Sequence, residues 1–415
     1  MHVIVPKKSL AEGLTHIERI IPTRSSNPGL SLVRIELGES GLICSGSNLD
    51  IDIEATIPAD VASMVGRSLT GEIAIPAQVF GQIVRALPGD QVSLQFAERE
   101  LAIESGSYAT KLQLSELTAP RVTFPTRYGG ELRGSDLAAA LANVRYAVAI
   151  AEYQAIFRGV KLEFGQGTRA VATDGFRLAY YHLAEATGLA GEVVLPSRSV
   201  DELIKLLSPA SNPARKPQGH PASKPHPASK PQDDKVKPAD TCRLELTDTQ
   251  LTVSTGRFRL NLKLMEGNFP DYQRVIPSQF DLHLTLDAKG LAEAVSRVAL
   301  LADKTTNNRV DFFILRAAQD RTAQDSVNQG ALQITAEGTY GRSQETLTVA
   351  PEGPEGSGEA LLQMALAYNA KYLVDALQPI QGKARLSFSG RTSPSVLLSL
   401  EDPGYLAMVV PLRTA

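Results

Sequence analysis

The sequence has no tryptophan and only two cysteines among its 415 residues. Cys44 lies in an apolar-rich stretch and Cys242 opens a strand-like run far along the chain, so we expect buried or edge thiols rather than a disulfide framework. Such cysteine usage favours a reducing compartment. No stretch approaches the ~18 consecutive apolar residues of a membrane-spanning helix, and the N-terminus lacks the apolar region of a signal peptide. A cytoplasmic protein is therefore expected.

An excess of positive charge is also missing. The 42 Lys and Arg residues against 45 Asp and Glu residues give a formal net charge of −3. Nucleic-acid-binding proteins usually show a basic excess. If DNA is the partner, the positive charge must be concentrated on one face and offset elsewhere.

The sequence lacks the compact motifs of a phosphate-binding loop, a zinc protease, a CxxC pair or an EF-hand. Its six histidines are scattered, and no clustered metal-ligand spacing is present. An enzymatic interpretation therefore has no constellation of residues to rest on, and we expect neither a metal nor a cofactor.

Two patterns imitate ligand sites. Residues 165–170 (GQGTRA) fit the GxGxxA pattern of dinucleotide-binding proteins, but such a site needs a helix that opens there. The following residues, 171–175, have the pattern of a strand and a turn, which favours a hairpin loop. Asp50, Asp52 and Glu54 share one side of a predicted strand but lack the loop of a calcium site, so we expect them to face solvent.

Internal repetition is the most informative feature that is present. Each third of the chain contains an early helical pattern, with apolar residues three and four positions apart, and a later one that follows a strand-like segment. Each pattern leaves one apolar stripe to bury. The early segments begin at 8, 135 and 289 and continue to 21, 148 and 301, and the later ones span 76–87, 196–207 and 368–377.

Alternating apolar and polar residues predict strands between and after these helices. Short turns join the strands, so neighbouring strands must be antiparallel. The sequence therefore predicts an α+β fold with three similar domains, each with two helices packed on antiparallel sheets. We place the domains at 1–127, 128–279 and 280–415, with boundaries where Gly, Pro and polar residues cluster. The predicted strands include 49–57, 92–96, 101–104, 160–164, 244–253, 332–336 and 397–400.

Residues 209–240 break the pattern of the middle domain. They are rich in Pro, Lys, Ala and Ser, and the hexapeptide HPASKP occurs twice, at 220–225 and 226–231. With almost no large apolar residue, the segment cannot bury enough surface to fold, and we expect a disordered insertion. A solvated loop extension is the favoured interpretation. The alternative is a loose DNA- or partner-binding arm that uses Arg215, Lys216, Lys224, Lys230, Lys235 and Lys237.

Three segments resemble motifs of one family, the bacterial DNA polymerase III beta subunit or DNA sliding clamp. Residues 171–179 (VATDGFRLA) resemble its ATDGHRLA signature, with Phe176 in place of the usual histidine. Residues 266–277 (EGNFPDYQRVIP) resemble its GxFPDYxRVxP run, and 408–413 (MVVPLR) resemble its closing segment. The motifs occur in family order, and with the threefold repeat the resemblance covers nearly the whole chain. Residues 209–240 are the main departure.

The resemblance implies a non-enzymatic processivity factor. Two subunits of three domains would join head to tail into a closed ring, with helices inside and sheets outside, around double-stranded DNA. Cations facing the hole would attract phosphates without reading bases. By resemblance, Arg24 and Arg198 align with DNA-contacting positions of the family. Further candidates on or beside the helices are Lys7, Arg85, Arg145 and Lys205.

The resemblance also implies a pocket for short linear motifs of the replicative polymerase, the clamp loader and repair polymerases. Such a pocket would be an apolar groove rimmed by arginines. Phe176 and Leu412 depart from the commoner residues of the family. The matching positions are Phe157, Thr173, Gly175, Phe176, Arg177 and Leu178, then Pro270, Arg274 and Val275, and then Ser395, Met408, Val410, Pro411, Leu412 and Arg413.

The subunit interface would join the first domain of one copy to the third domain of the other. By position, Leu112 and Leu114 are expected to meet Leu300 and Leu301 of the second copy. Two alternatives stay open at this point. The chain could be a peptide-binding scaffold that does not encircle DNA, or a nucleotide-dependent enzyme built on the turn at 165–170.

Overall fold

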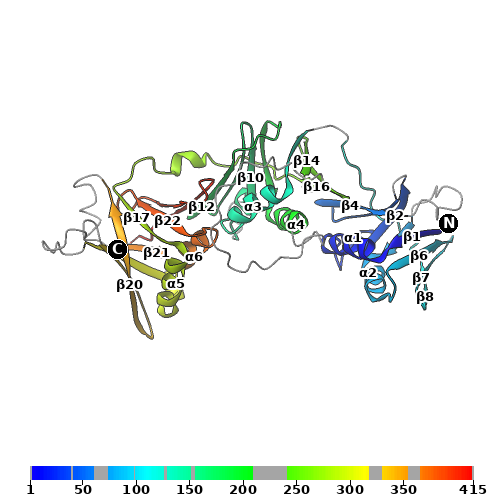
Figure 1. The fold of residues 1–415 in the computed structure, drawn as a ribbon, viewed down its shortest axis with the longest axis horizontal. Helices are drawn as coiled ribbons and strands as arrows, with labels where there is room; N and C mark the ends of the chain where they lie inside the picture. Colours follow the sequence, from blue (N-terminus) through cyan, green and yellow to red (C-terminus); the bar gives the residue numbers. More distant parts are fainter. Residues whose placement is uncertain are drawn as a thin grey trace, which may run out of the picture. The chain divides into compact units, whose positions relative to one another are not determined.

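A computed structural model of the chain describes residues 2–38, 41–59, 73–97, 99–125, 129–150, 155–208, 241–316, 330–353 and 365–413. Their helices pack on antiparallel sheets, so the predicted α+β class is confirmed (Figure 1). The chain divides into two compact units. The predicted insertion at 209–240 lies outside the described residues. The first unit comprises Met1–Ala138, Thr187–Leu189 and Asp201–Leu264, and the second comprises Ala139–Ala186, Ala190–Val200 and Met265–Ala415.

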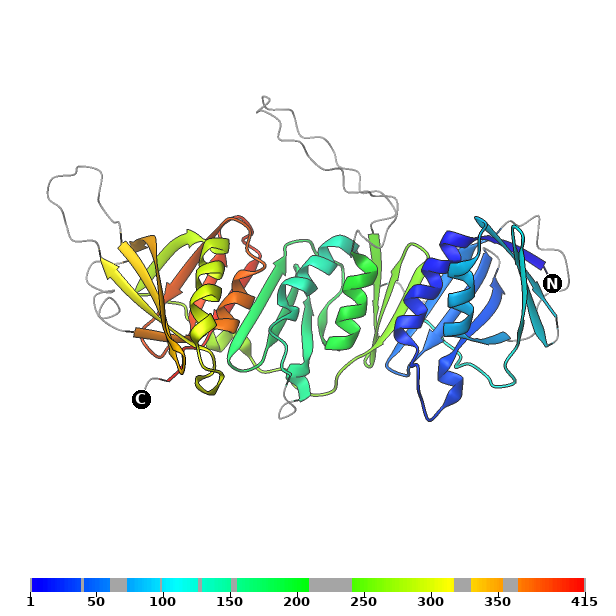
Figure 2. The same ribbon diagram turned by 90° about the horizontal axis from the view of Figure 1, so that it is seen from below.

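The described residues form six α-helices close to the predicted positions, because each segment carries one apolar stripe. In the first helix, Leu10, Leu14 and Ile17 are fully buried. The helices α1 and α2 lie side by side, as do α5 and α6 (Figures 1 and 2). None of the described helices is both long and apolar enough to span a membrane. Their bounds are α1 (Lys7–Ile20), α2 (Ala77–Ala86), α3 (Gly134–Arg145), α4 (Ser197–Leu207), α5 (Ala288–Val298) and α6 (Ala370–Leu377).

The first unit contains two antiparallel sheets. One has the strand order β1 (His2–Pro6), β6 (Gln91–Phe96), β7 (Glu100–Ser105) and β8 (Tyr108–Gln113). The other has eight strands, in the order β5 (Ile73–Pro76), β2 (Leu32–Gly38), β3 (Gly41–Ser47), β4 (Ile51–Pro58), β16 (Phe258–Lys263), β15 (Gln250–Thr255), β14 (Thr241–Leu246) and β9 (Gly130–Arg133).

The second unit contains a single sheet of twelve strands. It begins with β13 (Gly191–Pro196), β10 (Gly159–Phe164), β11 (Thr168–Thr173), β12 (Arg177–Leu183), β24 (Tyr405–Val409) and β23 (Ser395–Ser399). It continues with β22 (Lys383–Phe388), β17 (Leu282–Asp287), β20 (Gly341–Glu352), β19 (Gly330–Gly338), β18 (Arg309–Arg316) and β21 (Ala365–Asn369). Its main core surrounds Phe312, Tyr368 and Phe388, which are almost fully buried.

The strand orders repeat three times along the chain. The order β1-β6-β7-β8 recurs as β9-β14-β15-β16 and as β17-β22-β23-β24, and the order β5-β2-β3-β4 recurs as β13-β10-β11-β12 and as β21-β18-β19-β20. Two junctions join successive repeats: β4 pairs with β16, and β12 pairs with β24. This repetition supports three domains, whose boundaries stay a prediction.

Two strand predictions need correction. Residues 244–253 are not one strand, because a turn between β14 and β15 interrupts them, with the Thr247 N–H donating to the Gln250 carbonyl at 3.0 Å. The expectation that Asp50, Asp52 and Glu54 face solvent holds fully only for Asp50, because Asp52 and Glu54 on β4 are partly buried. Asp52 accepts hydrogen bonds from the Ser47 hydroxyl and the Asn261 amide, and both carboxylate side chains are half-buried.

Two expectations, for the turn at 165–170 and for the two cysteines, hold in the described residues. Gly165 donates its N–H to the Gly167 carbonyl at 3.0 Å in a hairpin turn between β10 and β11. A strand, rather than a helix, follows this turn, so it offers no helix N-terminus to a dinucleotide. Cys44 and Cys242 are free and buried, and burial raises the pKa of each thiol to about 12. The described residues contain no cluster of side chains suited to a metal ion.

Candidate functional site

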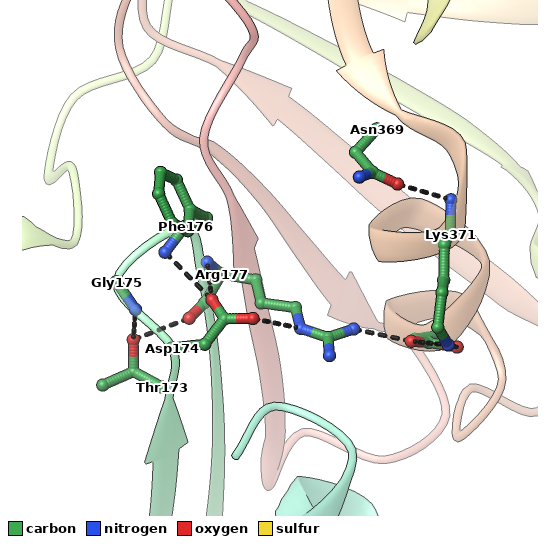
Figure 3. Close-up of polar contacts among 8 residues, drawn as sticks. Thr173, Asp174, Gly175, Phe176, Arg177, Asn369 and Lys371 are labelled. Atoms are coloured by element: carbon green, nitrogen blue, oxygen red, sulfur yellow. Dashed lines mark hydrogen bonds and ion pairs between the residues drawn. The ribbon is translucent and has the colours of Figure 1, made fainter. Parts of the chain in front are cut away.

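The loop at 173–177 joins β11 to β12 and is held by its own side chains (Figure 3). The Thr173 hydroxyl donates to the Arg177 carbonyl at 2.6 Å and accepts from the Gly175 N–H at 3.1 Å. The Asp174 carboxylate accepts from the N–H groups of Phe176 and Arg177 at 2.9 and 3.0 Å. Gly175 has a φ of +87°, which suits a residue without a Cβ. The loop therefore has a fixed shape and presents Phe176, whose residue is 55% exposed.

The Arg177 side chain lies inside the protein, not on the rim of a groove as the sequence suggested. Its Nε donates to the Asp174 carboxylate at 3.0 Å, and its Nη1 donates to the Asp375 carboxylate of α6 at 2.6 Å. The guanidinium also lies 4.5 Å from the ring centroid of Tyr372 and 5.5 Å from that of Tyr146. A buried charge is tolerated only when it is paired and hydrogen-bonded, and these contacts meet that requirement.

Buried tyrosines extend this network toward β24. The Tyr146 and Tyr405 hydroxyls lie 2.8 Å apart, and Tyr405 also donates to the Ala376 carbonyl at 2.7 Å. Burial raises the pKa of both phenols well above their usual value, so both stay neutral near pH 7. The Tyr368 hydroxyl lies 2.6 Å from that of the predicted pocket residue Ser395, which is 1% exposed. Ser395 therefore supports the fold from within rather than presenting its hydroxyl on the surface.

Three predicted pocket residues belong to one apolar cluster of the second unit. Phe157, Leu178 and Met408 share this cluster with Phe269, whose ring centroid lies 5.9 Å from that of Phe157. Leu178 and Met408 are direct cross-strand partners in the β12–β24 junction. Sequence patterns did not single out Phe269, although it directly precedes Pro270 in the 266–277 motif. Further members that they did not single out include Ile156, Tyr272, Ile276, Phe280 and Val396.

The C-terminal segment runs beside the loop at 173–177. The Val410 N–H donates to the Phe176 carbonyl at 2.9 Å, and the Leu412 N–H donates to the Ala367 carbonyl at 2.7 Å. Val410 and Leu412 are half-buried, Pro411 is buried and Arg413 is exposed. The hydrogen bond between Val410 and Phe176 thus brings the predicted pocket residues of the C-terminal segment beside those of the loop at 173–177.

The segment before β17 supplies exposed side chains. Tyr272 anchors it, since this residue is 4% exposed and its hydroxyl donates to Glu163 at 3.0 Å. Pro270 is exposed and Val275 is 51% exposed. The Arg274 side chain is 84% exposed and forms an ion pair of 2.8 Å with Asp271. Arg274 therefore faces solvent, where a bound chain could reach it.

The predicted DNA-binding cations differ in their surroundings. Arg24 lies exposed in the segment after α1, and Arg198 is exposed in the first turn of α4, whereas Arg145 is half-buried in the last turn of α3. A phosphate at Lys7, Arg85 or Lys205 would have to replace a specific contact. Lys7 donates to the Leu87 carbonyl at the end of α2, Arg85 contacts both carboxylate oxygens of Glu18 at 3.1 and 3.0 Å, and Lys205 pairs with Glu202 at 2.8 Å.

The predicted interface leucines lie near two sheet edges. Leu112 is half-buried on β8, and Leu114 follows that strand. Among the described strands, β8 has β7 as its neighbour on one side and none on the other. Leu300 is 82% exposed and Leu301 is half-buried in the 3-10 turn η6 (Ala299–Leu301). This turn lies beside β19 and β20.

Comparison with known families gives one consistent match. Residues 1–126, 131–215 and 273–413 match the models of the N-terminal, central and C-terminal domains of the DNA polymerase III beta subunit. Among curated proteins, the beta sliding clamp of Caulobacter vibrioides is 26% identical over the full length of both chains. That of Staphylococcus aureus is 25% identical over 95% of each chain.

Solved structures show the same fold. The DNA polymerase sliding clamp from Bacillus subtilis covers the whole chain with a TM-score of 0.80 at 23% identity. The DNA polymerase III beta subunit from Thermotoga maritima does so with a TM-score of 0.78 at 23% identity. Both matches include all of the other chain as well.

Proposed function

The chain belongs to the bacterial DNA polymerase III beta subunit family and serves as a DNA sliding clamp; from this premise we propose that it closes around DNA as a head-to-tail homodimer. The repeated strand order carries the proposal. In this repeat β4, β12 and β20 are equivalent, and so are β16, β24 and β8. The pairs β4–β16 and β12–β24 form within one chain, which leaves β20 and β8 for a second copy.

The described edges fit this third junction. The strand β20 pairs with β17 through residues 350–352 alone, so most of its length has β19 as the one described neighbour. A second copy would supply β8 to β20 and accept the same contact in return, and two such heterologous contacts close a ring. Leu112 and Leu114 beside β8, with Leu300 and Leu301 beside β20, would form its apolar part.

Sequence-independent contacts would hold the DNA. Arg24 and Arg198, both exposed, are the first candidates, with Lys7, Arg85, Arg145 and Lys205 as further ones. Phosphate contacts position a duplex without reading its sequence, so the ring can slide while it stays topologically linked. The chain would act without catalysis of its own in the cytoplasm, and a separate loader ATPase would open it.

A surface beside the β12–β24 junction would tether partners. We call this surface the peptide pocket. It combines exposed Phe176 and Val275, the half-buried Val410 and Leu412, and solvent-facing arginines over the apolar cluster that contains Phe157, Leu178 and Met408. Bulky apolar side chains of a short linear motif would insert there, while Arg274 and Arg413 would meet peptide carboxylates or carbonyls. The replicative polymerase, the clamp loader and repair polymerases are the proposed partners, and each would gain a high local concentration at the template.

Retention on nicked circular DNA, loaded with the cognate loader and ATP, tests this function. Retention that disappears when the circle is linearised would support a closed, sliding ring. The double variant Arg24→Ala with Arg198→Ala should then shorten the time that the protein is retained on the circle. Retention that survives linearisation would indicate ordinary surface binding. No retention with an active loader, together with a monomer in sedimentation, would favour the peptide-binding scaffold instead.

A further inference from the structure

The turn that presents Phe176 occurs a second time in the molecule. Residues 47–51 join β3 to β4, and their first two side chains accept the same hydrogen bonds as those of residues 173–177. The hydroxyls donate differently, Ser47 to the Asp52 carboxylate and Thr173 to the Arg177 carbonyl. The Ser47 hydroxyl accepts from the Leu49 N–H at 3.0 Å, as Thr173 does from Gly175. The Asn48 side chain accepts from the N–H groups of Asp50 and Ile51 at 3.0 and 2.8 Å. The Asp174 side chain accepts from the equivalent N–H groups of Phe176 and Arg177 at 2.9 and 3.0 Å.

Each turn also contacts the strand across its junction in the same way. The Lys263 N–H donates to the Asp50 carbonyl at 2.9 Å, and the Val410 N–H donates to the Phe176 carbonyl at the same distance. Leu49 has a φ of +76°, close to the +87° of Gly175. The two turns are thus one local structure with two sets of side chains.

The turns differ at the residue that starts the following strand. This residue is Ile51 in the first turn, 1% exposed, and Arg177 in the second, 4% exposed. Because the turn at 47–51 forms around an aliphatic residue and a neutral Asn48, it does not require a buried guanidinium. The ion pairs of Arg177 must therefore serve something other than the turn itself.

Those ion pairs connect the loop to helix α6. Asp375 accepts from Arg177 at 2.6 Å and from the Lys371 ammonium at 2.8 and 3.1 Å, and its side chain is 15% exposed. Figure 3 shows the Arg177 side chain extending from the loop toward the helix beside Lys371. Without this carboxylate, Asp174 alone would have to hold both the loop N–H groups and the guanidinium. The position of Phe176 relative to α6 would then be less restricted.

We propose that Asp375 is a positioning residue of the peptide pocket, which holds Phe176 in the peptide-binding arrangement through Arg177 and Asp174. The inference rests on the proposed peptide-binding function and adds to it a residue outside the recognised motifs. Pre-organisation of a binding surface acts mainly on complex lifetime. Loss of the Asp375 charge should therefore speed peptide dissociation and leave association nearly unchanged.

The test uses the full chain and a fluorescein-labelled peptide that carries leucine and phenylalanine as its bulky apolar residues. Asp375→Asn should weaken the peptide about tenfold or more, through a faster dissociation rate, and Asp375→Glu should recover most of the affinity. Lys371→Ala removes the exposed partner of Asp375 and should change affinity by about twofold at most. Asn48→Ala perturbs the equivalent turn of the first junction and is the matched control for general destabilisation.

The absence of tryptophan allows a direct readout of the loop, because Phe176→Trp supplies the chain's one indole. In that background, Asp375→Asn should lower the fluorescence anisotropy of the indole and shift its emission to longer wavelength, whereas Asn48→Ala should do neither. This measurement keeps the proposal testable if Asp375→Asn is too unstable for titrations at higher temperature.

The outcomes separate this inference from the function on which it rests. If the wild-type chain does not bind the peptide, the peptide pocket itself is wrong and the role of Asp375 falls with it. If the wild-type chain binds and Asp375→Asn binds equally well, Asp375 is not a positioning residue and the pocket stands. Equal weakening by Asp375→Asn and Asn48→Ala would also overturn the inference, since it would report general loss of stability.

Discussion

The β4–β16 and β12–β24 junctions share their strand pairing and their turn but differ in the side chains that surround them. Both begin with the same hydrogen-bonded turn and continue the sheet from one repeat into the next. The first places Ile51 where the second places Arg177. The first is also tied by the Arg257–Glu12 ion pair and by the edge contact of His16 with Phe258, at a centroid distance of 5.0 Å. The same turn thus serves both junctions, while the charged network occurs at the junction beside the proposed peptide pocket.

Among the substitutions that test this comparison, Arg177→Ala should cause the largest loss of stability. It leaves Asp174 and Asp375 buried without their shared cation, which typically costs about 3–5 kcal/mol. Urea denaturation should show this loss, and the double variant Arg177→Ala with Asp375→Asn should recover part of it, because one unpaired charge is removed. A loss below about 1 kcal/mol would mean that the network contributes little to the second junction.

Acid should weaken the first junction selectively. Burial, with contributions from Arg19 and Arg257, lowers the pKa of His16 to about 4 from its usual value of 6.5. The unfolded chain therefore takes up this proton more readily, so the stability contributed by neutral His16 is complete above about pH 6.5 and is lost as the pH falls toward 4. The full loss is about 3 kcal/mol.

The sequence repeat provides the control for this pH effect. Asn143 occupies the position equivalent to His16 in α3 and does not titrate. Hydrogen exchange at pH 7 and pH 5 should show β4 and β16 losing protection before β12 and β24, and His16→Gln should flatten the difference. Equal loss at both junctions would exclude His16 as the cause.

Substitutions of the two residues with positive φ, Gly175 and Leu49, should change stability less, and the two changes should have opposite signs. Gly175→Ala forces a Cβ into the left-handed region and should destabilise the chain by about 1 kcal/mol. Leu49→Gly removes that strain from the first turn but adds entropy to the unfolded chain, so we expect a gain between zero and about 1 kcal/mol. Thermal unfolding measures both, and destabilisation by Leu49→Gly would show that the exposed leucine makes a contact that matters.

Single cations should have the smallest effect on stability. The exposed Arg85–Glu18 pair is worth about 0.2–1 kcal/mol, so Arg85→Ala should barely change unfolding. If Arg85 and Arg24 also contact phosphates, each alanine variant should reduce by about one the slope of DNA affinity against salt, on logarithmic scales. Unchanged slopes for both variants would remove them from the proposed DNA-contacting set.

Periodicity predicted the regular elements well because each helix and most strands have one buried face. The stripe of Leu10, Leu14 and Ile17 is a local property, and so is the alternation of β4. The 244–253 prediction was wrong because Thr247 and its polar neighbours form a turn through side-chain and backbone hydrogen bonds, which interrupt an otherwise continuous pattern.

The candidate site was predictable only in part. Its apolar members came from the resemblance, but sequence patterns do not show that Arg177 is buried against Asp375, since these residues are 198 positions apart. The equivalence of the two turns was hidden for another reason. Ser47 and Asn48 accept the same hydrogen bonds as Thr173 and Asp174, so the geometry repeats while the residues change.

The proposed contact between β8 and β20 of successive copies carries a risk for self-assembly. A subunit that exposes both can join the next copy at either end, and nothing in the contact itself limits the number of copies. Heterologous contacts end only when their rotation brings the last copy back to the first, and otherwise they extend as a filament. Closure after two copies would thus do more than enclose DNA: it would pair both of these edges in each copy and prevent open-ended polymerisation through them.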